Sequence, residues 1–193
     1  GNENITLKYT DSNIFANSEM TLDVYSQDIE NVFFFSPNLA NPDEGYDGGQ
    51  SIIRSEKRGA RATFNTAIDF DGVEATFIYG IDALKDTTSQ PLVDGRVWVP
   101  EMEMDSLAGF LQTKWVIHDD VIVKAGVRRE SIDLSVDDYE TLKLCRSETQ
   151  CSVPLQVKGD TIDYDATTYN IAIKYNWSDS FSPFFNYSQG SDI

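Results

Sequence analysis

Alternation of apolar and polar residues recurs along this chain and constrains its fold more than any other feature. Near the C-terminal end, Tyr169, Ile171, Ile173, Tyr175 and Trp177 fall on one side of an extended segment, and small or polar residues fall on the other. A period of two is typical of a β-strand with one apolar and one polar face. Similar runs predict strands near residues 3–9, 20–34, 58–70, 73–83, 106–117, 121–133, 167–177 and 181–190, and no segment reads as a helix.

The apolar faces of the predicted strands carry no charge, and the charged side chains fall on the opposite faces. These charged residues are Arg61, Glu74, Asp82, Lys114, Lys124 and Arg128. A soluble β-sandwich and a transmembrane β-barrel both produce such strands, because each fold gives every strand one apolar and one polar side. The alternation alone leaves both folds open.

The connections between the strands differ in a regular way. Short turns at 71–72, 118–120 and 178–180 alternate with long polar segments at 35–57, 84–105 and 134–166. In an up-and-down sheet this places the short turns at one end and the long loops at the other, which is the asymmetry of outer-membrane barrels. We therefore predict an all-β, antiparallel up-and-down meander of about eight strands that forms part of a transmembrane β-barrel.

Aromatic residues and strand length agree with a membrane barrel. Phe70, Trp115, Trp177 and Phe181 lie within a few residues of the short turns, where barrels carry an interfacial aromatic girdle. A strand of about ten residues rises about 33 Å and, tilted near 45°, spans about 24 Å, which matches the apolar band of such barrels. We expect lipid on the apolar face and water or polar protein on the other.

Composition excludes several classes of function. The 193 residues include 15 Lys and Arg against 32 Asp and Glu, which gives a net charge of −17. Nucleic-acid binding requires clustered cations, so we expect no nucleic-acid partner. His118 is the only histidine and lies in a predicted turn, so no histidine-based catalytic set is present. The aspartates of 69–71 and 160–165 do not follow the spacing of a calcium-binding loop, and we expect no enzyme activity, cofactor or metal site.

Two features of the long segments bear on function. Cys145 and Cys151 are the only cysteines and lie close together in a polar connection. Because further Cys or His ligands for a metal are lacking, we expect a local disulfide and an oxidising compartment. The long segments also carry aromatic, Met and acidic residues, which suit recognition of a cargo with apolar and charged parts. The candidate contacts are Tyr46, Trp98, Met102, Met104 and Tyr139.

Four phrases of the sequence together resemble successive barrel segments of TonB-dependent outer-membrane receptors. They are "TLDVYSQDIENVFFF", "RSEKRGARATFNTAIDFDGVEATFIYGIDAL", "LAGFLQTKWVIHDDVIVKAGVRRESIDL" and "SPFFNYSQGSDI", and the resemblance runs from about Met20 to the end of the chain. It implies a barrel of about 22 strands in the bacterial outer membrane, with a plug domain in its lumen and a short N-terminal motif that meets TonB. No plug-like sequence stands in this chain, so we expect residues 1–193 to be a middle portion of a larger barrel.

The resemblance further implies uptake of a scarce nutrient, most often a ferric siderophore, with haem and cobalamin as other common cargoes. Two alternatives from other classes stay open. One is a complete small eight-stranded outer-membrane barrel with a structural or adhesion role. Side chains would pack the interior of such a barrel. The other is a secreted β-sandwich that binds a ligand, which the sorted loop lengths disfavour.

Overall fold

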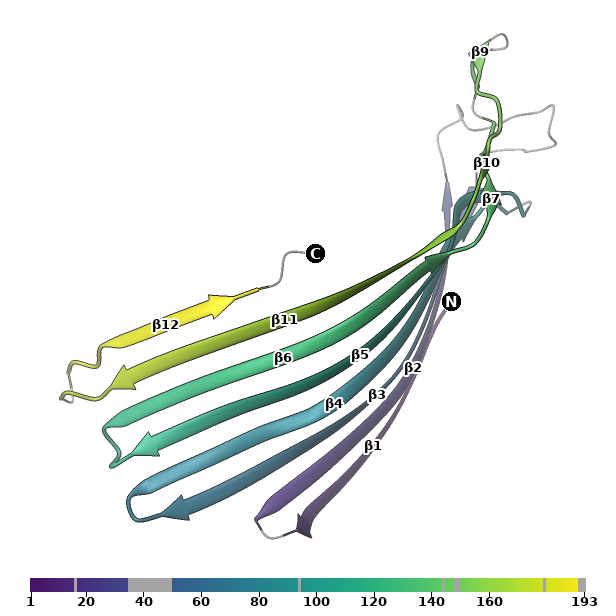
Figure 1. Ribbon diagram of the computed structural model, residues 1–193. Coiled ribbons are helices and arrows are strands. Elements are labelled where there is room, and N and C mark those ends of the chain that lie inside the picture. Colours follow the sequence, from purple (N-terminus) through teal and green to yellow (C-terminus); the bar gives the residue numbers. More distant parts are fainter. Residues whose placement is uncertain are drawn as a thin grey trace.

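One antiparallel sheet contains eight strands in chain order. The computed structural model of the protein describes residues 1–15, 17–34, 50–93, 95–143, 145–147, 150–178 and 180–190. The strand order follows the sequence (Figure 1), and neighbouring strands are hydrogen-bonded. The strands are β1 (Asn2–Phe15), β2 (Ser18–Phe34), β3 (Gln50–Phe70), β4 (Val73–Pro91), β5 (Val97–Ile117), β6 (Val121–Val136), β11 (Asp160–Tyr175) and β12 (Phe184–Gln189).

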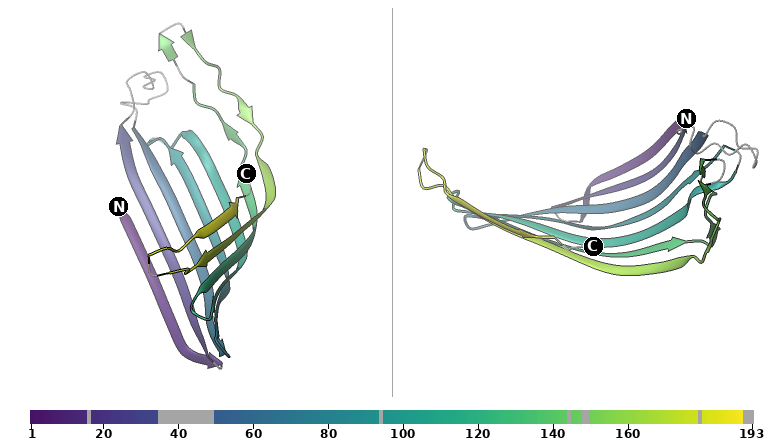
Figure 2. Two further views of the ribbon diagram at one scale, coloured as in Figure 1. Left: turned by 90° about the vertical axis from the view of Figure 1, so that its left-hand side faces the viewer. Right: turned by 90° about the horizontal axis from the view of Figure 1, so that it is seen from above.

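This topology confirms the predicted up-and-down meander and excludes a sandwich of two packed sheets. The sheet is curved (Figure 2), and β1 and β12 are its two edges among the described strands. No helix in the described part of the chain is long and apolar enough to cross a membrane.

The register brings the predicted apolar faces together on one side of the sheet, which we call the apolar face. Across β2 to β6, Val24 pairs with Ala60, Ala60 with Ala83, and Ala83 with Leu107. Side chains of this face are widely exposed although they are apolar; Leu7, Ile81 and Leu107 are 68%, 61% and 60% exposed. A face of this kind is expected to contact lipid rather than water.

Hydrogen bonds between neighbouring turns fix the end of the sheet where the connections are short. Asp71 and Gly72 have φ values of 39° and 80°, as the tight primed turns of hairpins require. The N–H of His118 donates to the carbonyl of Gly72 at 2.8 Å, and the N–H of Asn176 donates to the carbonyl of Asp120 at 2.7 Å. The predicted turn at 178–180 is longer than expected, because β11 ends at Tyr175 and β12 begins at Phe184.

The predicted aromatic girdle lies at this end. Phe70, Trp177 and Phe181 are exposed, and Trp115 packs edge-on against Phe77 with the ring centroids 5.3 Å apart. Such rings are amphipathic or apolar and suit the boundary between lipid and water.

The strands extend farther at the other end than the sequence predicts. The predicted loop at 84–105 is wrong for most of its length, because β4 continues to Pro91 and β5 begins at Val97. Likewise β3 begins at Gln50, β6 ends at Val136 and β11 begins at Asp160. These segments stay hydrogen-bonded to the neighbouring strands, so the sheet continues past the part of each strand that bears the apolar face. Between β6 and β11 the described residues form a projection with short paired strands: β7 (Tyr139–Glu140), β8 (Cys145–Ser147), β9 (Gln150–Cys151) and β10 (Gln156–Val157).

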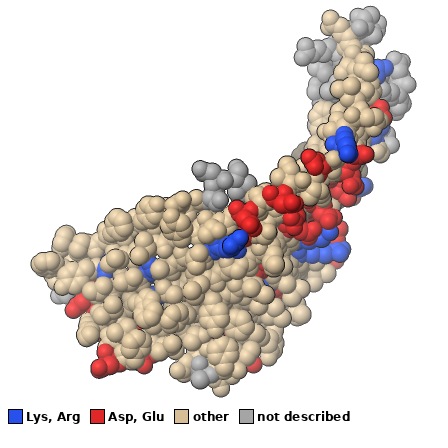
Figure 3. Space-filling model, in the orientation of Figure 1, with Lys and Arg blue, Asp and Glu red and all other residues tan. Residues whose placement is uncertain are grey.

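The polarity of the two faces reverses in these strand extensions. On the side continuous with the apolar face, Asp105 pairs with Asp133 and Asp133 with Asp163. On the opposite side, Met104 pairs with Leu134 and Leu134 with Ile162. Figure 3 shows a face largely free of charge over the strands, with most of the acidic and basic residues gathered toward the end that bears the projection and a few acidic residues at the opposite end. The reversal marks where the strands leave the predicted lipid layer.

Candidate functional site

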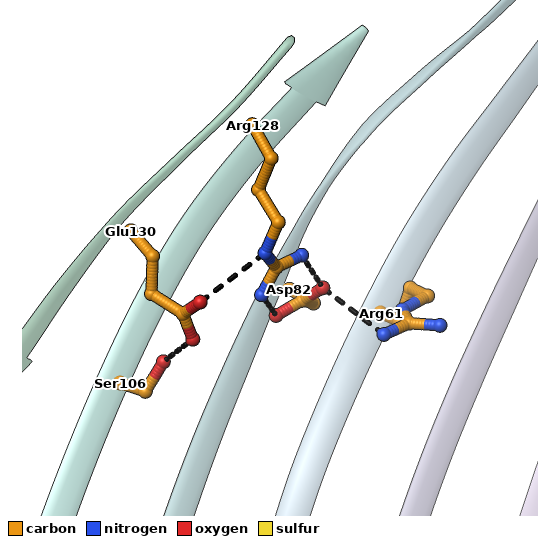
Figure 4. Close-up of polar contacts among 5 residues, drawn as sticks. All are labelled: Arg61, Asp82, Ser106, Arg128 and Glu130. Carbon is orange, nitrogen blue, oxygen red and sulfur yellow. Dashed lines mark hydrogen bonds and ion pairs between the residues drawn. The ribbon is translucent and has the colours of Figure 1, made fainter. Parts of the chain in front are cut away.

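Five polar side chains form a connected network on the polar face, opposite the apolar face (Figure 4). Asp82 on β4 lies at its centre. Arg128 on β6 donates from Nη1 to Asp82 Oδ2 at 2.7 Å and from Nη2 to Oδ1 at 3.1 Å. Arg61 on β3 donates from Nη2 to the same Oδ2 at 3.1 Å. One carboxylate is therefore shared by two guanidinium groups from the strands on either side.

The network extends through a second carboxylate on β6. Arg128 donates from Nε to Glu130 Oε2 at 3.2 Å, and the hydroxyl of Ser106 donates to Glu130 Oε1. Beyond Arg61 on the same face, Lys8 and Asp23 form a looser pair at 3.9 Å. Positively and negatively charged side chains thus alternate across the polar face from β1 to β6, at about the same height on each strand.

Sheet register and one small residue bring the network together. Asp82 pairs with Ala108, and Ala108 pairs with Glu130. Ala108 is only 2% exposed, and its short side chain leaves room for the Arg128 side chain to reach across β5 to β4. A larger side chain at residue 108 would stand between these partners.

Exposure within the network falls toward Asp82. The side chain of Asp82 is 11% exposed, that of Arg128 33% and that of Arg61 54%. Charge removed from water needs partners with good geometry, and the bidentate contact with Arg128 is the strongest geometry available to an arginine and a carboxylate. The predicted placement of Arg61, Asp82 and Arg128 on the polar face is confirmed, although their mutual contacts were not predicted.

The candidate cargo contacts lie apart from this network. Trp98, Met102 and Met104 belong to β5 itself rather than to a loop, and Tyr139 begins the projection in β7. Met104 lies beside Leu134 on the uncharged side of the strand extensions. Tyr46 lies outside the described residues. These assignments stay predictions.

The backbone brings the two cysteines of the predicted disulfide opposite each other. Cys145 and Cys151 are Cα partners in the β8–β9 ladder, and facing residues of antiparallel strands lie about 4.5–5.5 Å apart, within the range that a disulfide requires. Among the described residues, no group of three or more His, Cys, Asp or Glu side chains is arranged to hold a metal ion.

Comparison with known proteins identifies the family. Residues 2–192 match the sequence profile described as "TonB dependent receptor-like, beta-barrel". The chain belongs to this family. It is also 22% identical over 213 aligned positions to the ferric aerobactin receptor of Klebsiella pneumoniae, in an alignment that covers 98% of this chain and 28% of that receptor.

Solved structures agree with the fold. The open form of the ferric-catecholate import receptor Fiu from E. coli K12 matches 100% of this chain and 36% of its own length, with a TM-score of 0.69 and 9% identity. The siderophore receptor PiuA from Acinetobacter baumannii matches 97% of this chain and 32% of its own, with a TM-score of 0.64 and 12% identity. The copper transporter OprC matches 97% of this chain and 31% of its own length, with a TM-score of 0.66 and 10% identity. The chain therefore spans about a third of the length of the receptors that it matches.

Proposed function

We propose that this chain is part of the outer-membrane barrel of a TonB-dependent receptor that imports a ferric siderophore and has no enzyme activity. The observation that carries the proposal is the division of the sheet into an exposed, largely apolar face, with the Arg129–Asp165 pair toward its edge, and an opposite face with a connected ion-pair network. This division suits a wall with lipid outside and a polar lumen inside. The family match and the names of the ferric aerobactin receptor and of PiuA support the choice of cargo.

The remaining parts of the transport function belong to the rest of the receptor. The matched receptors are about three times as long as this chain, which supports the interpretation of residues 1–193 as one portion of a larger barrel. In this proposal the plug domain lies against the polar face, and TonB binds a segment that precedes the plug. The cargo is held above the lumen, where Met102 and Met104 line the uncharged side of the strand extensions.

Growth on defined iron sources tests the proposal. A strain that lacks the full-length gene should fail to grow under iron limitation on one ferric siderophore, and a plasmid copy of the gene should restore growth. The matched control is a copy with its TonB-binding segment deleted, which should assemble in the outer membrane but not restore growth. Unchanged growth of the deletion strain on every siderophore tested and on haem would contradict iron import.

A further inference from the structure

Two adjoining pockets lie on the polar face over β5, β6 and β11. The upper pocket, of about 520 Å³, has Arg128 and its network partners among its walls. The lower pocket, of about 350 Å³, lies nearer the short turns and is lined by Lys114 and Lys124. Gln112 and Asn170 line both pockets. The two pockets therefore form one continuous depression that follows the strands.

The two lysines of the lower pocket face each other across neighbouring strands. Lys114 on β5 pairs directly with Lys124 on β6, and both are exposed. Among the described residues neither lysine forms an ion pair, although Glu74 on β4 lies diagonally across from Lys114, one row nearer the short turns. Like charges that face each other across two strands are destabilising. An anion between the two lysines would therefore be favoured.

Cations continue in a line from the middle of the polar face toward the short turns. Along β6, Lys124 lies four residues from Arg128, which is about 14 Å at the usual rise of a strand. Lys174 on β11 pairs with Ile122, and this places it one row beyond Lys124. From Glu130 to the ends of the strands, the polar faces of β5, β6 and β11 carry these cations and no acidic residue.

The upper pocket shows how the wall treats its other cations. Arg128 and Arg61 share the carboxylate of Asp82, so the wall neutralises these charges with its own acid. Lys114 and Lys124 have no such partner in the wall. A depression lined by charge of one sign raises the local concentration of a mobile ligand of the opposite sign. The lower pocket is therefore suited to an anion that arrives through the lumen.

We propose that the two pockets form part of the path by which the cargo crosses the lumen, and that this cargo is an anionic ferric complex. The complex moves past Arg128 to Lys114 and Lys124, which hold it briefly by charge, and leaves beside Lys174 toward the short turns. The volumes of both pockets fall within the roughly 300–1,000 Å³ typical of sites for small ligands. This inference rests on the import of a ferric siderophore proposed above and deepens it by assigning the charge of the cargo and its side of the lumen.

Uptake of radioactive iron by cells that carry the full-length receptor tests the path. The probes are an anionic ferric tricatecholate complex and a neutral ferric trihydroxamate complex. For the anionic complex, Lys114→Gln/Lys124→Gln should lower the maximal uptake rate about fivefold. The half-saturating concentration should stay unchanged, because the cargo is first bound above the lumen.

Two further variants control this measurement. Lys114→Arg/Lys124→Arg keeps both charges and should transport the anionic complex at nearly the rate of the wild type. Arg54→Gln/Arg129→Gln removes the same charge from exposed ion pairs on the opposite side of the sheet and should also transport as the wild type does. All rates are compared per receptor present in the outer membrane.

Urea unfolding of the cargo-free receptor distinguishes a mobile anion from a fixed one. Without a fixed acid between the lysines, the loss of their repulsion should leave the unfolding midpoint of Lys114→Gln/Lys124→Gln equal to that of the wild type or slightly above it. A lower midpoint would show that a fixed group, such as a carboxylate of the plug domain, occupies the lower pocket, and would overturn the proposal. Unchanged uptake by this variant, or wild-type uptake of the neutral complex alone, would overturn it too. Uptake of neither complex by the wild type would instead count against the import of ferric siderophores.

Discussion

Asp82 and Arg128 are joined by two hydrogen bonds of 3.1 Å or less that cross the intervening strand β5. The two residues are 46 positions apart in the sequence, and Ala108 between them is too small to separate their side chains. This contact makes the polar face a connected charge network rather than a row of independent side chains.

Replacement of Arg128 should therefore destabilise the barrel wall. In Arg128→Met, Asp82 keeps only Arg61 as a partner among the network residues, and Glu130 keeps only Ser106. We therefore expect the free energy of unfolding to fall by about 2–4 kcal/mol. Urea unfolding of the full-length receptor measures this change. Arg129→Met is the control, because Arg129 lies on the opposite face in an exposed pair with Asp165 and should cost less than about 1 kcal/mol. Equal losses in both variants would contradict the structural role of the network.

Much of the fold follows from the sequence, but the contacts within the site do not. Apolar and polar residues alternate around Ile81 and Leu107, and this pattern predicts that both side chains lie on the apolar face of a strand. In "EMEMD" the alternation is just as regular, yet Met104 faces the lumen side and Glu103 faces outward, since the strand there has left the lipid layer. Alternation identifies two faces but does not say which solvent meets each. The Asp82–Arg128 contact depends on the register of three strands, which no local pattern specifies.

Two glycines on neighbouring strands should differ sharply in their tolerance of a side chain. A Cβ on Gly80 would overlap the carbonyl oxygen of Ala62 and lie 3.1 Å from the ring of Phe110. A Cβ on Gly109 would meet nothing nearer than an oxygen at 4.0 Å. We expect Gly80→Ala to cost about 1–3 kcal/mol and Gly109→Ala to be neutral or slightly stabilising. The midpoint of urea unfolding compares the two variants, and similar midpoints would refute the predicted close approach of β3 and β4.

The apolar face should reject charge as a lipid-facing surface does. Ile81→Arg places a cation among exposed apolar side chains, and because residue 81 lies toward the charged end of the apolar face, we expect a cost of about 1–2 kcal/mol, between the values for the middle and the edge of the bilayer. Gln112→Arg, on the polar face of β5, is the control and should assemble normally. The amount of folded receptor in the outer membrane is the measurement. Normal assembly of Ile81→Arg would favour contact of this face with water.

Asp133 should make the strand extensions sensitive to pH. Desolvation and the neighbouring carboxylates of Asp163 and Asp105 raise the pKa of Asp133 above its ordinary value. A raised pKa in the folded state means that the protonated form stabilises folding, and that this stability is lost as the pH rises through the folded-state pKa. Asp133→Asn should therefore raise the unfolding midpoint at neutral pH, and the gain should vanish as the pH falls toward 4, near the unfolded-state pKa. Asp165→Asn removes an acid paired with Arg129 and should give no such gain.

The projection above β6 and β11 should contain a disulfide between Cys145 and Cys151. These residues face each other in the β8–β9 ladder, and the projection lies at the end of the sheet that we assign to the cell exterior, where thiols oxidise. The loop they close is short, so the bond should stabilise by about 2–3 kcal/mol at most and should restrain the projection rather than the sheet. Unreduced peptides that span residues 140–158 should be lighter than the reduced form by the mass of two hydrogen atoms. Replacement of both cysteines by serine should leave assembly unchanged but increase hydrogen exchange in β8 and β9. Complete alkylation of both thiols in receptor isolated from cell envelopes would refute the bond and would weaken the assignment of this end to the exterior.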